Sequence, residues 1–258
     1  MSELSELITH ERDGVFTLTI NRPSRKNALT LAMYDALTAG LKEASERPSV
    51  RVALIQGAEG SFTSGNDLKD FAQNPPTGTD TPVFHFLKAL LDFPKPLVAA
   101  VDGVAVGIGT TMLLHCDLVY CTERARFALP FGKLGLVPEG GSSYLLPMMM
   151  GHQRASELLL LGESFGAQDA SRLGLVNEVV ETEELEAVIE ARLRSIVALP
   201  PEATRLSKQL IKAPFKEQLS RVMLEEGGVF ISRLGSPENQ EAIMAFFQKR
   251  APDFSRFS

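Results

Sequence analysis

The pattern of hydrophobic and polar residues predicts strands in the first two-thirds of the chain and helices in the last third. Residues 7–20 alternate around an Asp13-Gly14 turn, which predicts a β-hairpin. Helical spacing of apolar residues follows at 29–44, and a short apolar strand is expected at 52–55. Strand, helix and strand thus alternate from the start, which is typical of an α/β fold.

The middle of the chain continues this alternation, and Gly140 opens a stretch in which nearly every segment has helical spacing. The exception is an apolar piece at 175–180. Loops are expected at 58–65 and 129–138, and the segment 74–82, rich in Pro, Thr and Gly, is expected to be mobile. The remaining expected elements are a short helix after Asn66, helices at 84–91 and 108–115, and strands at 97–101 and 117–121.

A double proline, Pro200-Pro201, divides the chain into an expected α/β core with the active site at 1–199 and a helical C-terminal region at 200–258. Helices are predicted within that region at 201–212, 217–232 and 237–248. Their Leu, Met, Ile and Phe side chains exceed what the core can cover, which predicts that another subunit packs against them. The C-terminal region is therefore predicted to be an oligomerisation region.

Composition and charge narrow the possible partners. The 258 residues are 44% hydrophobic and carry a formal net charge of −6 without any basic run, so neither nucleic acid nor a membrane is expected as a partner. The longest apolar stretch, 97–106, is broken by Asp102 and Gly103, and no secretory signal is evident, which predicts a cytoplasmic protein. Cys116 and Cys121 are expected to be buried free thiols, and the histidines show no metal-ligand spacing.

Three segments carry small residues where a strand gives way to a helix: 61–68, 100–109 and 134–144. This geometry leaves backbone N–H groups free at a helix N-terminus, where negative charge is also favoured. Taken alone, each segment has an ordinary interpretation: a turn with an N-cap, close glycine packing, and a helix starting at Pro138-Glu139. Their occurrence together favours a functional site over three separate structural features.

In this order and spacing, the three segments resemble the crotonase (enoyl-CoA hydratase/isomerase) family over about residues 14 to 250. The resemblance implies a spiral of repeated strand-strand-helix units with a helical C-terminal region. It also implies an oxyanion hole made by the backbone N–H groups of Asn66 and Ile108, with Gly107 as the alternative second donor. Paired amides of this kind stabilise the charge that forms on a thioester oxygen when the neighbouring carbon loses a proton.

Hydratases of the family use two glutamates, one as base and one as acid. This chain has Thr111 at the first of those positions and Phe131, after Pro130, at the second. Neither side chain can perform that acid–base chemistry. Hydration is therefore not expected to be the main activity.

Glu139, eight residues after Phe131, lies in a run similar to the delta-3, delta-2-enoyl-CoA isomerases, whose single base has this position. One carboxylate suffices for a 1,3-proton shift, since it can take a proton from C2 and return it to C4. The apolar neighbours of Glu139 would raise its pKa, whereas a helix N-terminus would lower it. The sequence leaves open which effect is larger.

The resemblance also implies a coenzyme A thioester as substrate, with no further cofactor and no metal. Arg25 and Lys26 are the expected cations for its phosphates, beside Ala28. Asp67 is expected to cap a helix as well, and His115 is expected to be a satisfied core residue. The family implies a homotrimer or a dimer of trimers. Further contacts to the acyl-CoA are expected from Ser64, Gly65, Asp67, Leu68, Gly107 and Phe131.

Other activities of the family remain open at this point. A ring-opening or aromatic acyl-CoA isomerase would have aspartate in place of Glu139, and a chlorobenzoyl-CoA dehalogenase would need a tryptophan that this chain lacks. Weak hydratase activity is a further alternative. A non-catalytic or RNA-binding homologue is disfavoured by the acidic charge and by the acid at position 139.

Overall fold

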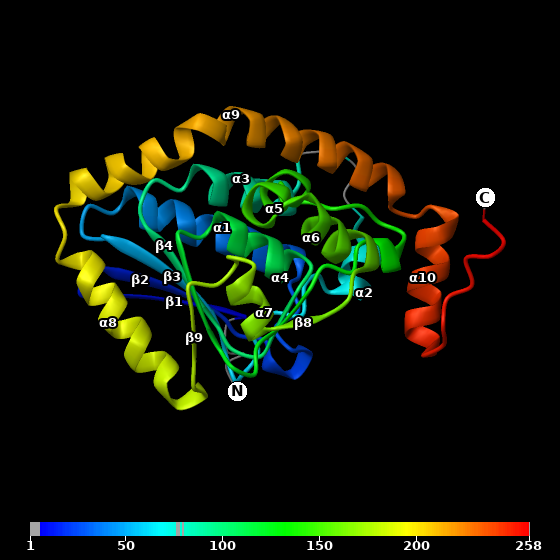
Figure 1. Ribbon diagram of the computed structural model, residues 1–258, viewed down its shortest axis with the longest axis horizontal. Helices are drawn as coiled ribbons and strands as arrows, with labels where there is room; N and C mark the ends of the chain where they lie inside the picture. The colour runs from blue at the N-terminus through cyan, green and yellow to red at the C-terminus, as the bar shows by residue number, and fades with distance from the viewer. Residues whose placement is uncertain (1–5, 76–77, 79, 258) are drawn as a thin grey trace.

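The structure, a computed structural model, describes residues 6–75, 78 and 80–257 (Figure 1). A six-stranded sheet forms its centre. Its first two strands are antiparallel and pair Leu7 with Ile20, which confirms the predicted hairpin, and each later strand is parallel to its neighbour. In spatial order the strands are β1 (Leu7–Arg12), β2 (Val15–Ile20), β3 (Val52–Gly57), β4 (Leu97–Val101), β6 (Leu118–Thr122) and β9 (Glu178–Val180).

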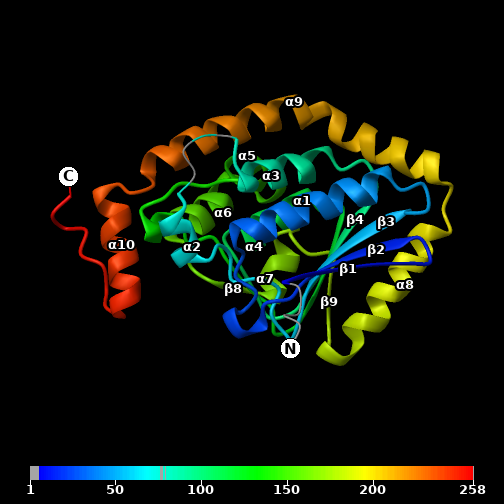
Figure 2. The same cartoon turned by 180° about the vertical axis from the view of Figure 1, so that it is seen from behind.

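The large sheet is covered on both faces, so its central strands are apolar throughout. Along β3, Ala53 and Ile55 face α1 (Leu31–Glu46) and α3 (Pro82–Asp92), whereas Val52 and Leu54 pack with residues of α8 (Leu185–Val197). Figures 1 and 2 show the two layers, with α1 and α3 on one side and α8 on the other. Burial on both faces explains why these strands read as continuous apolar runs.

A second sheet of three very short strands was not predicted. It consists of β5 (Val104–Val106), β7 (Arg126–Ala128) and β8 (Phe165–Gly166). The sequence predicted no strand between 101 and 117 or at 126–128, and it predicted helical spacing for nearly every segment after Gly140, so these expectations were wrong at the three strands. Strands of two or three residues are too short to show a period, and pairing with distant segments defines them.

The C-terminal helices differ from the prediction in one respect. The helices expected at 201–212 and 217–232 form one helix, α9 (Pro201–Arg233), which continues through Pro214 and is followed by α10 (Pro237–Gln248). A proline inside a helix removes one backbone hydrogen bond and costs about 3 kcal/mol. Burial of Leu219, Met223 and Phe230 along the same helix offsets that cost.

The remaining helices are short and connect the strands. The predicted mobility of 74–82 concerns a segment whose residues 76–77 and 79 lie outside those described. Within the described part of the chain, no helix is long and apolar enough to cross a membrane. The short elements are η1 (Pro23–Arg25), α2 (Leu68–Gln73), α4 (Ile108–Thr111), η2 (Met112–His115), η3 (Gly132–Leu134), α5 (Ser142–Met150), α6 (His152–Ser156), the π-helix η4 (Glu157–Leu161), α7 (Ala167–Arg172) and η5 (Thr182–Glu184).

Candidate active site

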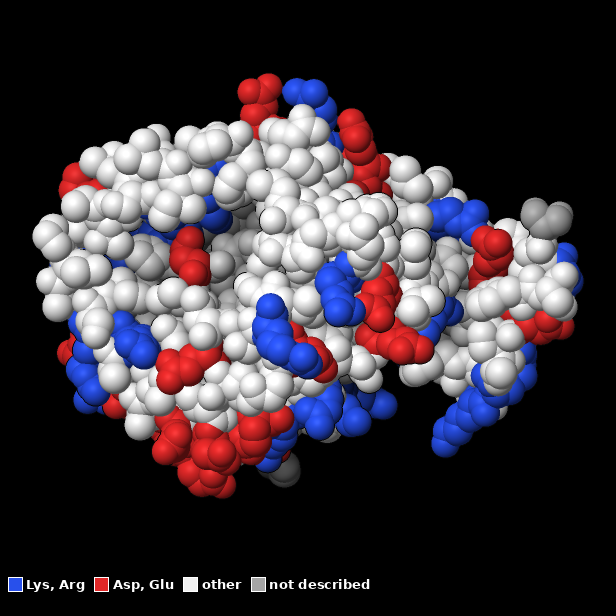
Figure 3. Space-filling view, in the orientation of Figure 1, with Lys and Arg blue, Asp and Glu red and all other residues white. Residues whose placement is uncertain are grey.

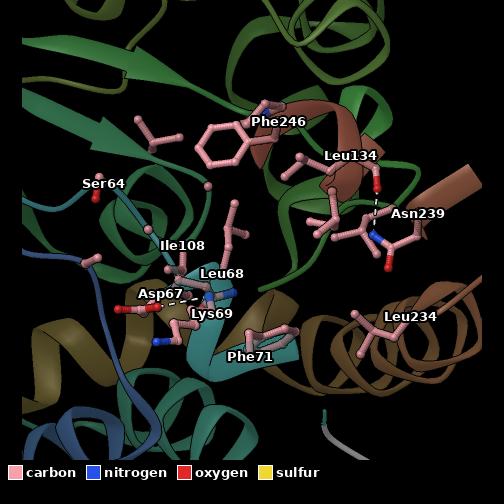
Figure 4. A pocket seen from close by; sticks show the side chains of 18 of the residues that line it. Ser64, Asp67, Leu68, Lys69, Phe71, Ile108, Leu134, Leu234, Asn239 and Phe246 are labelled. Carbon is pink, nitrogen blue, oxygen red and sulfur yellow. Dashed lines mark hydrogen bonds between the residues drawn. The ribbon is translucent and has the colours of Figure 1, made fainter. Parts of the chain in front are cut away.

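A cavity of about 970 Å³ opens between the loop before α2, the start of α4 and the last two helices. Figure 4 shows Asp67, Leu68 and Ile108 on one side of it and Leu134, Leu234 and Asn239 on another. All but one of the site residues predicted from the sequence line this cavity; Lys26 does not. Those on its wall are Arg25, Ala28, Ser64, Gly65, Asn66, Asp67, Leu68, Gly107, Ile108, Phe131 and Glu139.

Two segments far apart in sequence come together to form the expected oxyanion site. The N–H of Thr63 donates to the carbonyl of Val104 at 2.9 Å, and the N–H of Val106 donates back to Thr63 at 3.1 Å. Gly65 has a φ of +88°, and a Cβ there would lie 2.7 Å from the Val106 carbonyl oxygen. Only glycine permits this approach, which brings the backbone of residues 65–66 beside that of 106–108.

The backbone N–H groups of Asn66 and Ile108 are free to bind a ligand. Ile108 is the first residue of α4, where an N–H has no partner within its own helix. In the described part of the chain, neither N–H donates a hydrogen bond to another protein group. Both residues line the cavity, so the geometry agrees with an oxyanion site at the start of α4.

Tyr34, which the sequence analysis did not single out, fixes the side chain of Asn66. Tyr34 is fully buried in α1, and its hydroxyl donates to Oδ1 of Asn66. This contact turns the Asn66 side chain towards α1. The tyrosine lies within a helical pattern that reads simply as core, so no sequence signal separates it from its apolar neighbours.

Glu139 places a buried carboxyl group in the cavity. Its Oε1 accepts a hydrogen bond from the Thr111 hydroxyl, while its buried Oε2 has no partner among the described residues. Burial raises the pKa of Glu139 to about 8; the Thr111 hydrogen bond lowers it and the nearby charge of Glu226 raises it further. Burial therefore outweighs the other influences, which decides the question that the sequence left open.

The N-terminus of α5, the helix that follows Glu139, binds the side chain of another residue, Glu226. Helix α5 starts at Ser142, so the alternative interpretation of Pro138-Glu139 as an ordinary helix start does not hold. The N–H groups of Gly141 and Ser143 donate to the Glu226 carboxylate at 2.6 and 2.9 Å. Glu226 comes from α9, far along the chain, and no local sequence pattern indicates this contact.

Asp67 and Glu139 are the two acids among the residues that line the cavity. Asp67 caps α2 by accepting the N–H groups of Lys69 and Asp70, as predicted, and Arg22 binds it at 2.7 Å. Partial burial raises the pKa of Asp67, but the hydrogen bonds from Arg22 and the backbone outweigh this and lower it. The carboxylate of Asp67 is thus already bound by Arg22 and by backbone N–H groups. Of the two acids, Glu139 is therefore the one suited to accept a proton.

The positions that hold glutamates in hydratases carry other side chains in the same site. Thr111 is fully buried and contacts Glu139, and Phe131 lines the cavity with only 6% of its surface exposed. Neither has an ionisable group within the pH range of proteins. Thr111 and Phe131 therefore supply no second acid–base group beside Glu139.

Among the described residues, three cationic side chains line the cavity. Arg25 lines the cavity, and so do Arg22 and Lys69, which the sequence analysis missed. Arg22 is already paired, since it binds Glu6 at 2.9 Å as well as Asp67. The carbonyl of Lys26 accepts the N–H of Ser64 at 2.9 Å, so this residue contributes its backbone to the loop.

The C-terminal helices complete the wall. Asn239 of α10 donates to the carbonyl of Leu134 at 2.8 Å, and Phe246 also borders the cavity (Figure 4). Phe230 of α9 packs edge-on against Phe71 of α2, with ring centroids 6.3 Å apart. The cavity is therefore shared between the core and the region after residue 200.

Other predictions concern residues outside the cavity. His115 is buried and its Nε2 lies 2.7 Å from the carbonyl oxygen of Gly140, which confirms it as a satisfied core residue. Cys121 is a buried free thiol and Cys116 a half-buried one. Among the described residues there is no group of three or more His, Cys, Asp or Glu that could hold a metal ion.

The fold and the site together define an α/β protein that brings the backbone amides of Asn66 and Ile108 and the carboxyl group of Glu139 to one cavity. The family described as enoyl-CoA hydratase/isomerase matches residues 10–256. This chain therefore belongs to the enoyl-CoA hydratase/isomerase family, as the sequence motifs predicted.

Individual relatives carry both kinds of name. Human enoyl-CoA delta isomerase 2 is 36% identical over 252 residues, which cover 95% of this chain and 64% of that protein, so the chain spans less than two-thirds of this relative. The 2,3-dehydroadipyl-CoA hydratase of Escherichia coli is 36% identical over 253 residues, covering 97% of this chain and 99% of that protein. The solved structure of Pseudomonas aeruginosa OdaA has a TM-score of 0.91 and 49% identity, covering 94% of this chain and 99% of that one.

Proposed function

We propose that this protein moves the double bond of a 3-enoyl-CoA to C2, with Glu139 as the single acid–base group. The observation that carries this proposal is the buried, unpartnered Oε2 of Glu139 in a cavity where Thr111 and Phe131 replace the acids of hydratases. A proton shift needs one group that alternates between base and acid. Net addition of water needs a base and an acid together.

In the proposed reaction, the amides of Asn66 and Ile108 bind the thioester oxygen. Glu139 takes a proton from C2; the electron pair of that C–H bond forms a C1–C2 double bond, and negative charge moves to the oxygen. The carbonyl then reforms, a C2–C3 double bond replaces the C3–C4 double bond, and the proton returns from Glu139 to C4. No atom is gained or lost, so no co-reactant is required.

We propose that the coenzyme A moiety lies at the cationic end of the cavity. Arg25 lines this end and is the side chain that we expect to bind a phosphate, because Arg22 is already paired with Glu6 and Asp67. Lys26 stays a predicted phosphate contact that could reach only a part of the ligand outside the cavity. The acyl chain would pass Phe71, Phe131 and Phe230, which supply an apolar surface.

We propose that the protein assembles as a homotrimer or a dimer of trimers through α9. This helix exposes Leu206, Leu210 and Ile211 at 47%, 72% and 70% of their surface, and Figure 3 shows few charged side chains over this part of the molecule. Isolated exposed leucines are common, but several along one helix favour contact with a second copy. Light scattering at micromolar concentration should give at least three times the monomer mass. A cytoplasmic location stays a prediction.

The test of the function is a comparison of two reactions on the same chain length. Purified protein should convert 3-enoyl-CoA thioesters of graded length to 2-enoyl products, and should hydrate the corresponding 2-enoyl-CoA at least about 100-fold more slowly, since it lacks the second acid. Glu139→Gln, made in parallel, controls for a contaminating isomerase. Equal rates for the two reactions would refute isomerisation as the main activity.

A further inference from the structure

The helical segment from Ile108 to His115 contacts the base-carrying loop at two points. Thr111 donates its hydroxyl to Oε1 of Glu139, and His115 contacts the carbonyl of the next residue, Gly140, through Nε2 at 2.7 Å. Thr111 and His115 are four residues apart, and both side chains contact the loop that carries Glu139. The segment that begins with the backbone N–H of Ile108 therefore also positions the loop that carries Glu139.

The contact with the loop is close as well as polar. Gly140 has a φ of +67°, and a Cβ at this position would lie 3.3 Å from both Cβ and Oγ1 of Thr111. Burial lowers the pKa of His115 to about 4, so the imidazole is neutral in the range where the protein works and donates its N–H to Gly140. The backbone beside Glu139 is therefore fixed independently of its side chain.

The neighbouring threonine, Thr110, has a purely structural role. Thr110 is as completely buried as Thr111, but its hydroxyl donates to the carbonyls of Ala105 at 2.6 Å and Ala128 at 3.2 Å. Those bonds tie α4 to β5 and β7. Thr111 has the same size and burial, yet its hydroxyl binds the one acid that the proposed reaction uses.

We propose that Thr111 is the positioning residue of Glu139: it holds Oε1 so that the unpartnered Oε2 is the oxygen that carries the proton. The inference rests on the proposed function. Taking a proton from C2 and delivering it to C4 requires one oxygen to reach both carbons without rotation of the carboxyl group. A hydroxyl donor on the other oxygen fixes that rotation and also stabilises the ionised form.

Among the described residues, Tyr34 of α1 and Glu226 of α9 interact with the charge of Glu139, and His115 of η2 contacts the neighbouring Gly140. Burial raises the pKa of Tyr34 well above its ordinary value and lowers that of His115, so both are neutral near pH 7. Burial also raises the pKa of Glu226, whereas its hydrogen bonds with Ser143 and Gly141 lower it, and its negative charge raises the pKa of Glu139. A substitution of Thr111 alters none of the three, so its effects report on the hydroxyl.

The test compares Thr111→Val with Thr110→Val, two nearly isosteric changes at adjacent buried sites. A hydrogen bond to a charged group contributes about 1.5–3 kcal/mol, so Thr111→Val should lower kcat roughly 10- to 100-fold with little change in KM. The acidic limb of its pH–rate profile should move to higher pH, because the hydroxyl lowers the pKa of Glu139. Thr111→Ser should recover most of the activity.

Thr110→Val should lower the melting temperature and leave the position of the acidic limb unchanged. If Thr111→Val kept both the kcat and the pH profile of the parent, the positioning role would be wrong. If Thr111→Ser stayed as slow as Thr111→Val although both fold, the hydroxyl would not be the cause. Thr111→Ala offers the same comparison should the valine variant fail to fold.

A direct titration separates this inference from the proposed function. With ¹³C-labelled glutamate, the carboxyl signal of Glu139 is the one that disappears in Glu139→Gln, and its midpoint should be higher in Thr111→Val than in the parent. This readout needs no substrate. A parent without isomerase activity would overturn the proposed function, whereas an unmoved midpoint would overturn the role of Thr111.

Discussion

The carboxylate of Glu226 accepts the backbone N–H of Gly141 at 2.6 Å, across the contact between α9 and the start of α5. Its other oxygen accepts the N–H and the hydroxyl of Ser143. Because both oxygens accept hydrogen bonds from backbone N–H groups, the ionised form of Glu226 fits the site. The amides that could have stabilised an anionic Glu139 are therefore already used.

Glu226→Gln should destabilise the protein and lower the pKa of Glu139. An amide can accept only one of the two N–H bonds, and loss of a charged hydrogen bond in a mostly buried site costs about 1.5–3 kcal/mol of unfolding free energy. Loss of the nearby negative charge makes ionisation of Glu139 easier. Denaturant unfolding and the pH–rate profile measure the two effects. Ser143→Ala, which keeps the charge, should destabilise less and leave the acidic limb in place.

The pH dependence of kcat/KM should follow the ionisation of Glu139. Its pKa of about 8 means that the free protein holds this carboxyl group protonated at lower pH, when it cannot act as a base. We expect kcat/KM to rise about tenfold per pH unit below pH 8 and to level off above it. The same profile with a 3-enoyl-pantetheine, which has no phosphate, excludes ionisation of the substrate. A plateau that already begins near pH 5 would contradict the raised pKa.

Tyr34→Phe should weaken catalysis without unfolding the protein. The phenol packs against Phe86, with ring centroids 5.6 Å apart, so phenylalanine keeps the apolar contacts. It removes the hydrogen bond to Oδ1 of Asn66 and leaves that amide free to turn towards the cavity. We expect kcat to fall about 3- to 10-fold, the effect of one neutral hydrogen bond of about 1 kcal/mol. Unchanged kcat would mean that the Asn66 backbone keeps its position unaided.

Sequence reasoning succeeded where a pattern is local. The hairpin of residues 7–20 and the strand Leu97–Val101 lie where alternation and apolar runs placed them, because burial on one or both faces selects such residues. The motif residues Asn66, Ile108 and Glu139 do meet in one cavity. Their spacing reflects turns at the ends of strands, which are also local features.

What the sequence could not predict depends on contacts between distant segments. Thr111, Tyr34 and Glu226 are positioned by the packing of α4, α1 and α9 around Glu139, and none of them differs in type from an ordinary helix residue. Separate helices were expected at 201–212 and 217–232, but packing along α9 continues the helix through Pro214. The raised pKa of Glu139 likewise follows from burial that only the folded chain creates.

Glu139→Gln should change both the catalytic activity and the stability of the protein. Removal of the base should lower isomerisation by about 10⁴-fold, the upper part of the range for general bases, because the same group serves both proton steps. Acyl-CoA binding should change little, since the oxyanion donors are backbone groups. If the variant kept activity within about tenfold of the parent, the assignment of Glu139 as the base would be wrong.

The same variant should gain stability relative to the parent as pH rises. In the parent, the unfolded chain releases the Glu139 proton near pH 4.5, whereas the folded protein holds it until about pH 8. Between these values the folded state binds more protons, so the parent loses about 1.4 kcal/mol of unfolding free energy per pH unit from this group. Glutamine does not titrate and keeps the Thr111 hydroxyl satisfied through its carbonyl oxygen. Urea unfolding at pH 6, 7 and 9 should therefore show the stability difference between variant and parent growing up to about pH 8 and then levelling off; a difference independent of pH would mean that Glu139 titrates alike in the folded and unfolded states.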